Sequence, residues 1–120
     1  MSVLKKSERI TAAKVLRAMG HPVRLGVLEC LRDGPRTVTE LFEALGCSQS
    51  MMSQQLRTLE YHGLISSRKE GVQKYCRLRN HDVLNMLECV HRHMHRYLSG
   101  AGIGASTEDA VRGSASGPDR

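Results

Sequence analysis

The segment over residues 37–78 constrains the fold more than any other part of the chain. Thr37-Val38-Thr39-Glu40 has the S/T-x-x-E form of a capping box, which predicts a helix that runs to Leu45. Gly46 can supply the positive φ that a helix C-cap requires, and Ser48 is a good N-cap for a second helix. Two short helices separated by so tight a turn predict a helix-turn-helix.

The second of these helices has one apolar and one polar face. Met52, Leu56 and Leu59 recur at helical spacing, so we expect them to be buried. Downstream, residues 64–69 and 74–78 alternate loosely and flank a glycine-containing tip, which predicts a β-hairpin. Helix, turn, polar-faced helix and basic hairpin together predict a winged helix-turn-helix fold, mostly α with a small β-hairpin.

The polar helix face and the hairpin carry the side chains that we expect to contact duplex DNA. Glutamine can pair bidentately with adenine, arginine suits guanine or phosphate, and serine can bond to either. A basic hairpin beside such a helix would touch the sugar–phosphate backbone or the minor groove. The predicted DNA-binding residues are Ser48, Gln49, Ser50, Ser53, Gln54, Arg57, Arg68, Lys69, Gln73 and Lys74. The alternative is an ordinary solvated helix face, and the hairpin that follows argues against it.

Composition supports a polyanionic partner. The formal net charge is +6 with a sequence pI near 9.5, and each Lys or Arg placed near a phosphate releases condensed counterions. The chain has one Phe, three Tyr and no Trp, too few aromatic side chains for the stacking platforms that bind single strands. No apolar run approaches the length of a membrane span and no signal peptide opens the chain, so we expect a cytoplasmic protein with no membrane partner.

Helices are also predicted on both sides of this segment. Residues 7–19 and 22–31 predict two helices before it, and residues 81–98 predict a long helix after it. The last helix has an apolar face that so small a domain has no obvious means to cover. That face contains Val83, Leu87, Val90, Met94, Tyr97 and Leu98. We expect one domain over residues 1–98, followed by a disordered Gly-, Ala- and Ser-rich tail over residues 99–120.

From about residue 10 to residue 98 the chain resembles the ArsR/SmtB family. The matching motifs are Ala18–Leu25, Thr39–Leu41, Ser53–Leu59, His62–Ile65, Arg68–Gly71 and Tyr75–Leu78. The resemblance implies a homodimeric winged-helix repressor whose first and last helices form the dimer interface. It also implies binding to an inverted-repeat operator in double-stranded DNA and release by an inducer. The uncovered apolar face of the last helix independently suits such an interface.

A metal inducer would require ligands that this chain has only in part. One family pattern places a Cys-x-Cys pair in the helix before the turn, and that helix has no cysteine here. A second pattern needs four ligands on the last helix, and Leu84 and Leu98 stand where two of them would be. We therefore expect no metal cofactor. The weak candidates that remain on the last helix are Asp82, Glu88, His91 and His95.

Two other kinds of inducer stay open. Some family members respond to persulfides or oxidants through one cysteine in the second helix and one in the last, where this chain has Cys30 and Cys89. Cys30 lies one position later than the family pattern, which turns it about 100° around its helix. Other members bind organic molecules, S-adenosylmethionine among them. We expect an organic metabolite first, a cysteine-based persulfide or redox sensor second, and a metal third.

Two other functional classes fit the sequence less well. An enzyme would need a nucleophile, a base and an orienting group that converge in a pocket, and no HExxH motif or phosphate loop is present. We therefore expect no enzymatic activity. A winged helix that binds proteins is the closer rival. The charges of Arg57 and of the hairpin favour duplex DNA over a protein partner.

Overall fold

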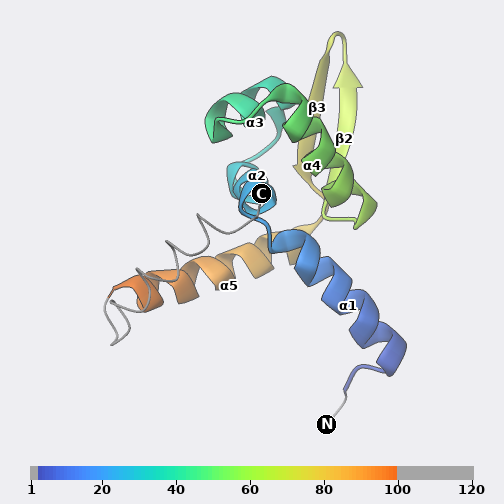
Figure 1. Cartoon of the computed structure of the whole chain (residues 1–120), viewed down its shortest axis with the longest axis vertical. Helices are drawn as coiled ribbons and strands as arrows, with labels where there is room; N and C mark the ends of the chain where they lie inside the picture. Colours follow the sequence, from blue (N-terminus) through green and yellow to red (C-terminus); the bar gives the residue numbers. More distant parts are fainter. Residues whose placement is uncertain (1–2, 100–120) are drawn as a thin grey trace. The chain divides into compact units, whose positions relative to one another are not determined.

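The computed structural model describes residues 3–99, which fall into two compact units that divide between Leu84 and Asn85. In chain order the first unit contains α1 (Lys6–Met19), α2 (Pro22–Cys30), β1 (Arg36–Thr37), α3 (Val38–Leu45), α4 (Gln49–Tyr61), β2 (Ile65–Glu70) and β3 (Gln73–Leu78) (Figure 1). The last helix, α5 (His81–Leu98), begins in the first unit and continues into the second. Among the described residues, no helix is both long enough and apolar enough to cross a membrane.

The helix-turn-helix forms as its capping residues predict. The Thr37 hydroxyl accepts a hydrogen bond from the Glu40 amide at 3.0 Å, and the Glu40 carboxylate accepts one from the Thr37 amide at 2.9 Å. Gly46 closes α3 with φ at 66°, in the left-handed region that glycine favours. The Ser48 hydroxyl then caps α4 by accepting from the Met51 amide at 3.0 Å. These four local features set both ends of α3, the turn that follows it and the start of α4.

The predicted hairpin is confirmed, and it belongs to a three-stranded antiparallel sheet. The strand order is β1-β3-β2, with Thr37 of β1 opposite Tyr75 of β3. The strands β2 and β3 continue closer to the tip than we predicted, so that only Gly71 and Val72 form the turn. The strand β1 was not predicted, because two residues are too few to show a strand periodicity.

A single apolar face of α4 forms much of the core of the first unit. Met52, Leu56 and Leu59 are buried as predicted, and buried side chains of α2 and α3 such as Leu28 and Leu41 belong to the same core. The helix has no large apolar residue on its other side except Tyr61, which is exposed near its end. The buried stripe therefore determines which face of α4 is left to solvent.

The apolar face of α5 is only partly open. Val83 and Leu87 are buried within the chain itself, whereas Val90 is 39% exposed, Met94 40% and Leu98 58%. The expectation that the whole stripe lacks cover was therefore wrong for its first two members. A face of α1 is exposed as well, with Leu16 at 60%.

Two expectations about domain limits stay predictions. The first is a single domain over residues 1–98. The second, disorder over residues 99–120, concerns a segment of which only Ser99 is among the described residues.

Candidate nucleic-acid interface

The outward face of α4 is polar and open. Because the apolar stripe packs inward, the polar side chains gather on the opposite side and line one open hollow there. These side chains are Gln49, Ser50, Ser53, Gln54 and Arg57. Ser53 is half-buried and the other four are exposed. The structure thus brings together five of the six DNA-binding residues predicted at α4. The hydroxyl of the remaining one, Ser48, serves as the helix cap.

The hairpin, which we call the wing (residues 65–78), places two lysines side by side. Lys69 of β2 lies directly opposite Lys74 of β3, one pair before the tip. Neither forms an ion pair with a carboxylate among the described residues. Like charges directly opposite each other destabilise a strand pair, and a bound anion would relieve the repulsion. This pair is therefore well suited to contact a phosphate.

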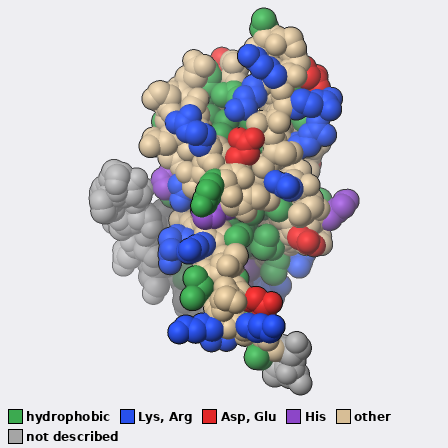
Figure 2. All heavy atoms as spheres, turned by 90° about the vertical axis from the view of Figure 1, so that its right-hand side faces the viewer, with side chains coloured by type: hydrophobic (Ala, Val, Ile, Leu, Met, Phe, Trp, Pro, Cys, Tyr) green, Lys and Arg blue, Asp and Glu red, His purple; other side chains and the backbone are tan. Residues whose placement is uncertain are grey.

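The wing lysines share a face with the side of the hairpin that meets α4. Ser67 lies opposite the buried Cys76, and the Ser67 hydroxyl donates a hydrogen bond of 2.6 Å to the Glu60 carboxylate of α4. Side chains two residues apart on a strand point to the same face, so Lys69 and Lys74 lie on this face too, closer to the tip. Figure 2 shows Lys and Arg side chains gathered at the wing end of the molecule.

Arg68 is less free than the sequence suggested. Its guanidinium forms an ion pair with Glu70, with the Nη2–Oε2 distance at 2.8 Å and the Nε–Oε2 distance at 3.3 Å. Residues two apart on a strand share a face, and this spacing could have predicted the pair. Both side chains are largely exposed, and such pairs contribute about 1 kcal/mol or less. Arg68 can therefore break its ion pair with Glu70 and bind a phosphate instead, at a small cost in free energy.

The candidate sensing cysteines differ in their surroundings. Cys30 of α2 is half-buried, and burial raises the pKa of its thiol, an effect that the nearby Arg36 guanidinium partly offsets. Burial likewise raises the pKa of the Cys76 thiol in β3. Cys89 of α5 is exposed. Burial thus disfavours the thiolate of Cys30, which is the nucleophilic form, whereas the neighbouring Arg36 favours it.

We expect Cys30 and Cys76 to react slowly with iodoacetamide at neutral pH. Both should speed up only above the pH range in which an exposed thiol titrates, because their thiolates are disfavoured. Timed alkylation followed by peptide mass spectrometry measures each site, with exposed Cys89 as the internal reference and urea-unfolded protein as the control. Equal rates at Cys30 and Cys89 in folded protein near pH 7 would contradict this prediction.

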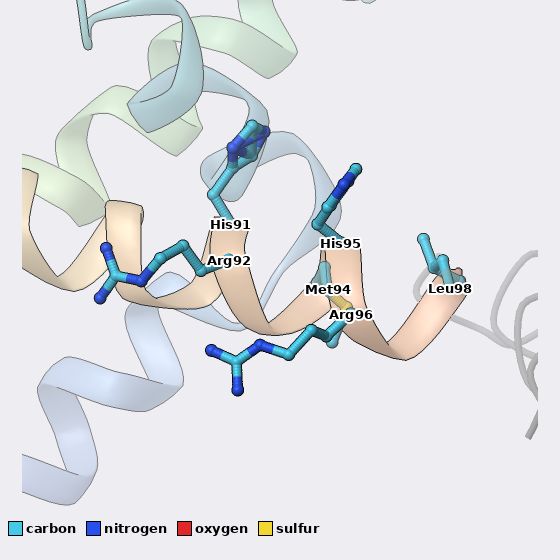
Figure 3. A pocket seen from close by; sticks show the side chains of 6 residues that line it. All are labelled: His91, Arg92, Met94, His95, Arg96 and Leu98. Atoms are coloured by element: carbon cyan, nitrogen blue, oxygen red, sulfur yellow. The ribbon is translucent and has the colours of Figure 1, made fainter. Parts of the chain in front are cut away.

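The metal candidates of α5 are only partly brought together. His91 and His95 lie one helical turn apart on the same side of the helix (Figure 3). They line a hollow together with Arg92, Met94, Arg96 and Leu98. Within residues 3–99, no three His, Cys, Asp or Glu side chains are grouped so that they could hold a metal ion. Asp82 and Glu88 therefore do not complete a site with the two histidines in this chain.

A tight helical turn, an open polar helix face and an adjoining basic hairpin define a winged helix-turn-helix protein. A family model described as a helix-turn-helix domain matches residues 19–68. With the relatives described next, these features show that the chain belongs to the ArsR/SmtB family of winged helix-turn-helix transcriptional regulators.

The relatives are transcriptional regulators and not enzymes. The regulator NmtR of Mycobacterium tuberculosis is 46% identical over 59 residues, which are 49% of this chain and 49% of NmtR, so the chain covers about half the length of that relative. The transcriptional activator HlyU of Vibrio cholerae is 37% identical over 91 residues, covering 74% of this chain and 84% of HlyU.

Solved structures agree with this assignment. One structure of HlyU has a TM-score of 0.69 at 35% identity and covers 73% of this chain and 96% of its own. The homodimeric winged helix-turn-helix DNA-binding domain Mb0332 of Mycobacterium bovis has a TM-score of 0.73 at 26% identity. That match covers 85% of this chain and 97% of the domain. The predicted fold class is thereby confirmed.

Proposed function

We propose that this protein is a homodimeric, cytoplasmic repressor that binds an inverted-repeat operator in double-stranded DNA. One observation carries the proposal: the polar outer face of α4 lies open beside a wing whose two opposed lysines have no carboxylate partner among the described residues. Glutamine, serine and arginine on α4 supply the groups that pair with base edges in the major groove. The wing lysines supply contacts to phosphate.

The proposed dimer follows from exposed apolar side chains. Val90 and Met94 of α5, together with Leu16 of α1, present apolar surface that a partner protomer would cover. The Mb0332 domain is described as homodimeric, which supports the same assembly here. A twofold dimer presents two α4 helices related by symmetry, and such a pair matches two half-sites in inverted orientation.

Repression and its relief are proposed from the resemblance to the family. An inducer can act only if it binds one dimer geometry more tightly than the other. An organic metabolite, with S-adenosylmethionine-type ligands included, stays our proposal for that inducer. The raised pKa of Cys30 counts against a thiol sensor that depends on this residue, because the reactive thiolate is disfavoured there.

Salt-titrated binding to duplex DNA tests the proposal. The probe is a duplex that the wild-type protein enriches from a random-sequence library, and the dissociation constant is measured by fluorescence anisotropy at several salt concentrations. We expect log Kd to depend linearly on log salt, and Lys69→Ala with Lys74→Ala to make the slope shallower by about 0.9 for each phosphate that is no longer neutralised. The weakening should be the same on random-sequence duplex, because a phosphate contact carries no sequence information.

Lys6→Ala with Lys14→Ala is the matched control, because it removes the same charge from two exposed lysines of α1 that do not belong to the wing. It should leave the slope unchanged. Binding without salt dependence, or a slope that the wing double variant does not alter, would refute the wing assignment. A wild-type protein that enriches no duplex at all would refute DNA binding and favour a protein-binding winged helix.

A further inference from the structure

One guanidinium joins three helices of the first unit. Arg24 lies in the first turn of α2, and its Nε donates a hydrogen bond of 2.6 Å to the carbonyl oxygen of Ala18 in the last turn of α1. Its Nη1 donates a second bond of 2.7 Å to Oε1 of Gln55 on α4. A side chain on α2 therefore connects the end of α1 to the helix that carries the candidate DNA-binding face.

Gln55 is a buried amide on the otherwise apolar face of α4. It is 7% exposed and lies in line with Met52, Leu56 and Leu59. Its Nε2 donates to Sδ of Met51 at 3.2 Å, and its Oε1 accepts from Arg24. A buried amide left without partners would cost about 1–3 kcal/mol, so this glutamine depends on Arg24 for its acceptor oxygen. The bond is thus partly buried, because it joins the buried Gln55 amide to an arginine that is itself half-buried.

Arg24 is placed so that it stabilises the end of α1 but is electrostatically unfavourable at the start of its own helix, α2. A cation in the first turn of α2 faces the positive end of that helix dipole, and burial lowers the pKa of its guanidinium. At the other end of the contact, the Ala18 carbonyl is one of the last four of α1, which lack partners within the helix. The charge of Arg24 also complements the negative C-terminal end of α1. Its local cost is therefore offset by contacts to other helices.

We infer that Arg24 is a positioning residue that sets the angle between α1 and the recognition helix α4. The inference rests on the proposed function, in which α1 contributes to the dimer interface and α4 binds DNA. In such a dimer, the angle between α1 and α4 determines how far apart the two recognition helices lie. Arg24, acting through Gln55, would thereby set the half-site spacing that the dimer accepts.

The chemistry requires arginine at this position. A guanidinium is a planar fork whose donors point in fixed directions, so one group can bond to the Ala18 carbonyl and the Gln55 amide at once. A lysine ammonium is a point charge on a flexible stem and does not fix two acceptors relative to each other. Arg24→Lys keeps the charge and removes the geometry. Gln55→Met removes the acceptor at similar volume.

The first test needs no DNA. Residual dipolar couplings of the backbone amides in α1 and α4 report the angle between the two helices in the full-length wild-type protein and in Arg24→Lys. We expect the angle to change, or the α1 couplings to shrink from motion, beyond the error of repeat measurements. Arg17→Lys, an exposed substitution in the last turn of α1, should match wild type. An Arg24→Lys protein with wild-type couplings would overturn the inference.

The second test measures spacing. The probes are the enriched duplex and two derivatives in which its half-sites are moved apart or together by one base pair. We expect Arg24→Lys to bind the enriched duplex about tenfold more weakly and to lose most of the wild-type preference among the three, because a less fixed angle tolerates more spacings. Binding to random-sequence duplex should be unchanged. A wild-type ranking of the three probes by Arg24→Lys would overturn the role in spacing.

The two proposals fail in different ways. If wild-type protein enriches no duplex, the proposed function is refuted, while the helix angle still decides whether Arg24 is a positioning residue. If Arg24→Lys does not fold by circular dichroism, Gln55→Met takes its place in both tests. A folded Gln55→Met protein with the wild-type angle and the wild-type ranking of the probes would overturn the inference.

Discussion

Replacing Gln54 and Arg57 together with alanine is expected to weaken binding to the enriched duplex by about 100-fold or more. Removing one side chain that pairs with a base costs about 1–3 kcal/mol, and a dimer carries each of these side chains twice. Both side chains are exposed on the outer face of α4, so the fold should be unaffected. Fluorescence anisotropy at one fixed salt concentration measures the affinity, and circular dichroism checks the fold.

The contrast with the wing makes this prediction specific. The Gln54→Ala, Arg57→Ala protein should lose its preference for the enriched duplex over a scrambled one, whereas the wing double variant should weaken both duplexes alike. If the ratio of the affinities for the enriched and the scrambled duplex is unchanged, Gln54 and Arg57 are excluded as sources of specificity. In that case another part of the chain would have to supply the base contacts.

Introducing glutamate at Val90 and Met94 is expected to convert a dimer into monomers at micromolar concentration. These side chains are 39% and 40% exposed, so they can be replaced without opening the core, unlike the buried Leu87. Each twofold interface would have to take up four carboxylates, and burial of an unpaired charge costs several kcal/mol. Sedimentation velocity measures the assembly, and affinity for the enriched duplex should fall because a monomer contacts one half-site.

The matched control is Asn85→Glu with Cys89→Glu. These two exposed positions have the same spacing of four residues and add the same charge, but they lie on the opposite side of α5. The control protein should stay dimeric. A monomeric wild-type protein at micromolar concentration would refute the dimer itself. If the Val90→Glu, Met94→Glu protein stays dimeric, the interface lies elsewhere.

The helix-turn-helix could be predicted from the sequence because its signals are local. Thr37 and Glu40 form the capping box, Gly46 adopts the positive φ, and Ser48 caps the next helix, all within a few residues of the bonds they make. The stripe of leucine and methionine then assigned the buried face of α4. Where capping, turn and periodicity agree, the outward face follows, and most of the candidate DNA-binding set follows with it.

What could not be predicted depends on contacts between distant residues. The bond from Arg24 to Gln55 spans 31 positions, and only the amide in an apolar stripe hinted that a partner existed. An apolar stripe also does not show whether its own chain or another copy covers it, which is why the burial of Leu87 was missed. The ion pair of Arg68 with Glu70 was not predicted, because the positive charges of the wing were considered without the carboxylate among them.

Thr37 joins the sheet to the helix-turn-helix, and this connection affects how the winged helix meets DNA. The residue pairs with Tyr75 on the central strand β3, and its hydroxyl also caps α3, so the sheet and the helix-turn-helix share one residue. Thr37 therefore ties the wing to the helix-turn-helix at this junction, and we expect the bond pair to resist tilting of the wing away from the helices. A duplex would meet α4 and the wing already in their binding arrangement, and the protein would lose little conformational entropy on docking. Differences in affinity between sequences would then arise mainly from the contacts themselves and from the stiffness of the DNA.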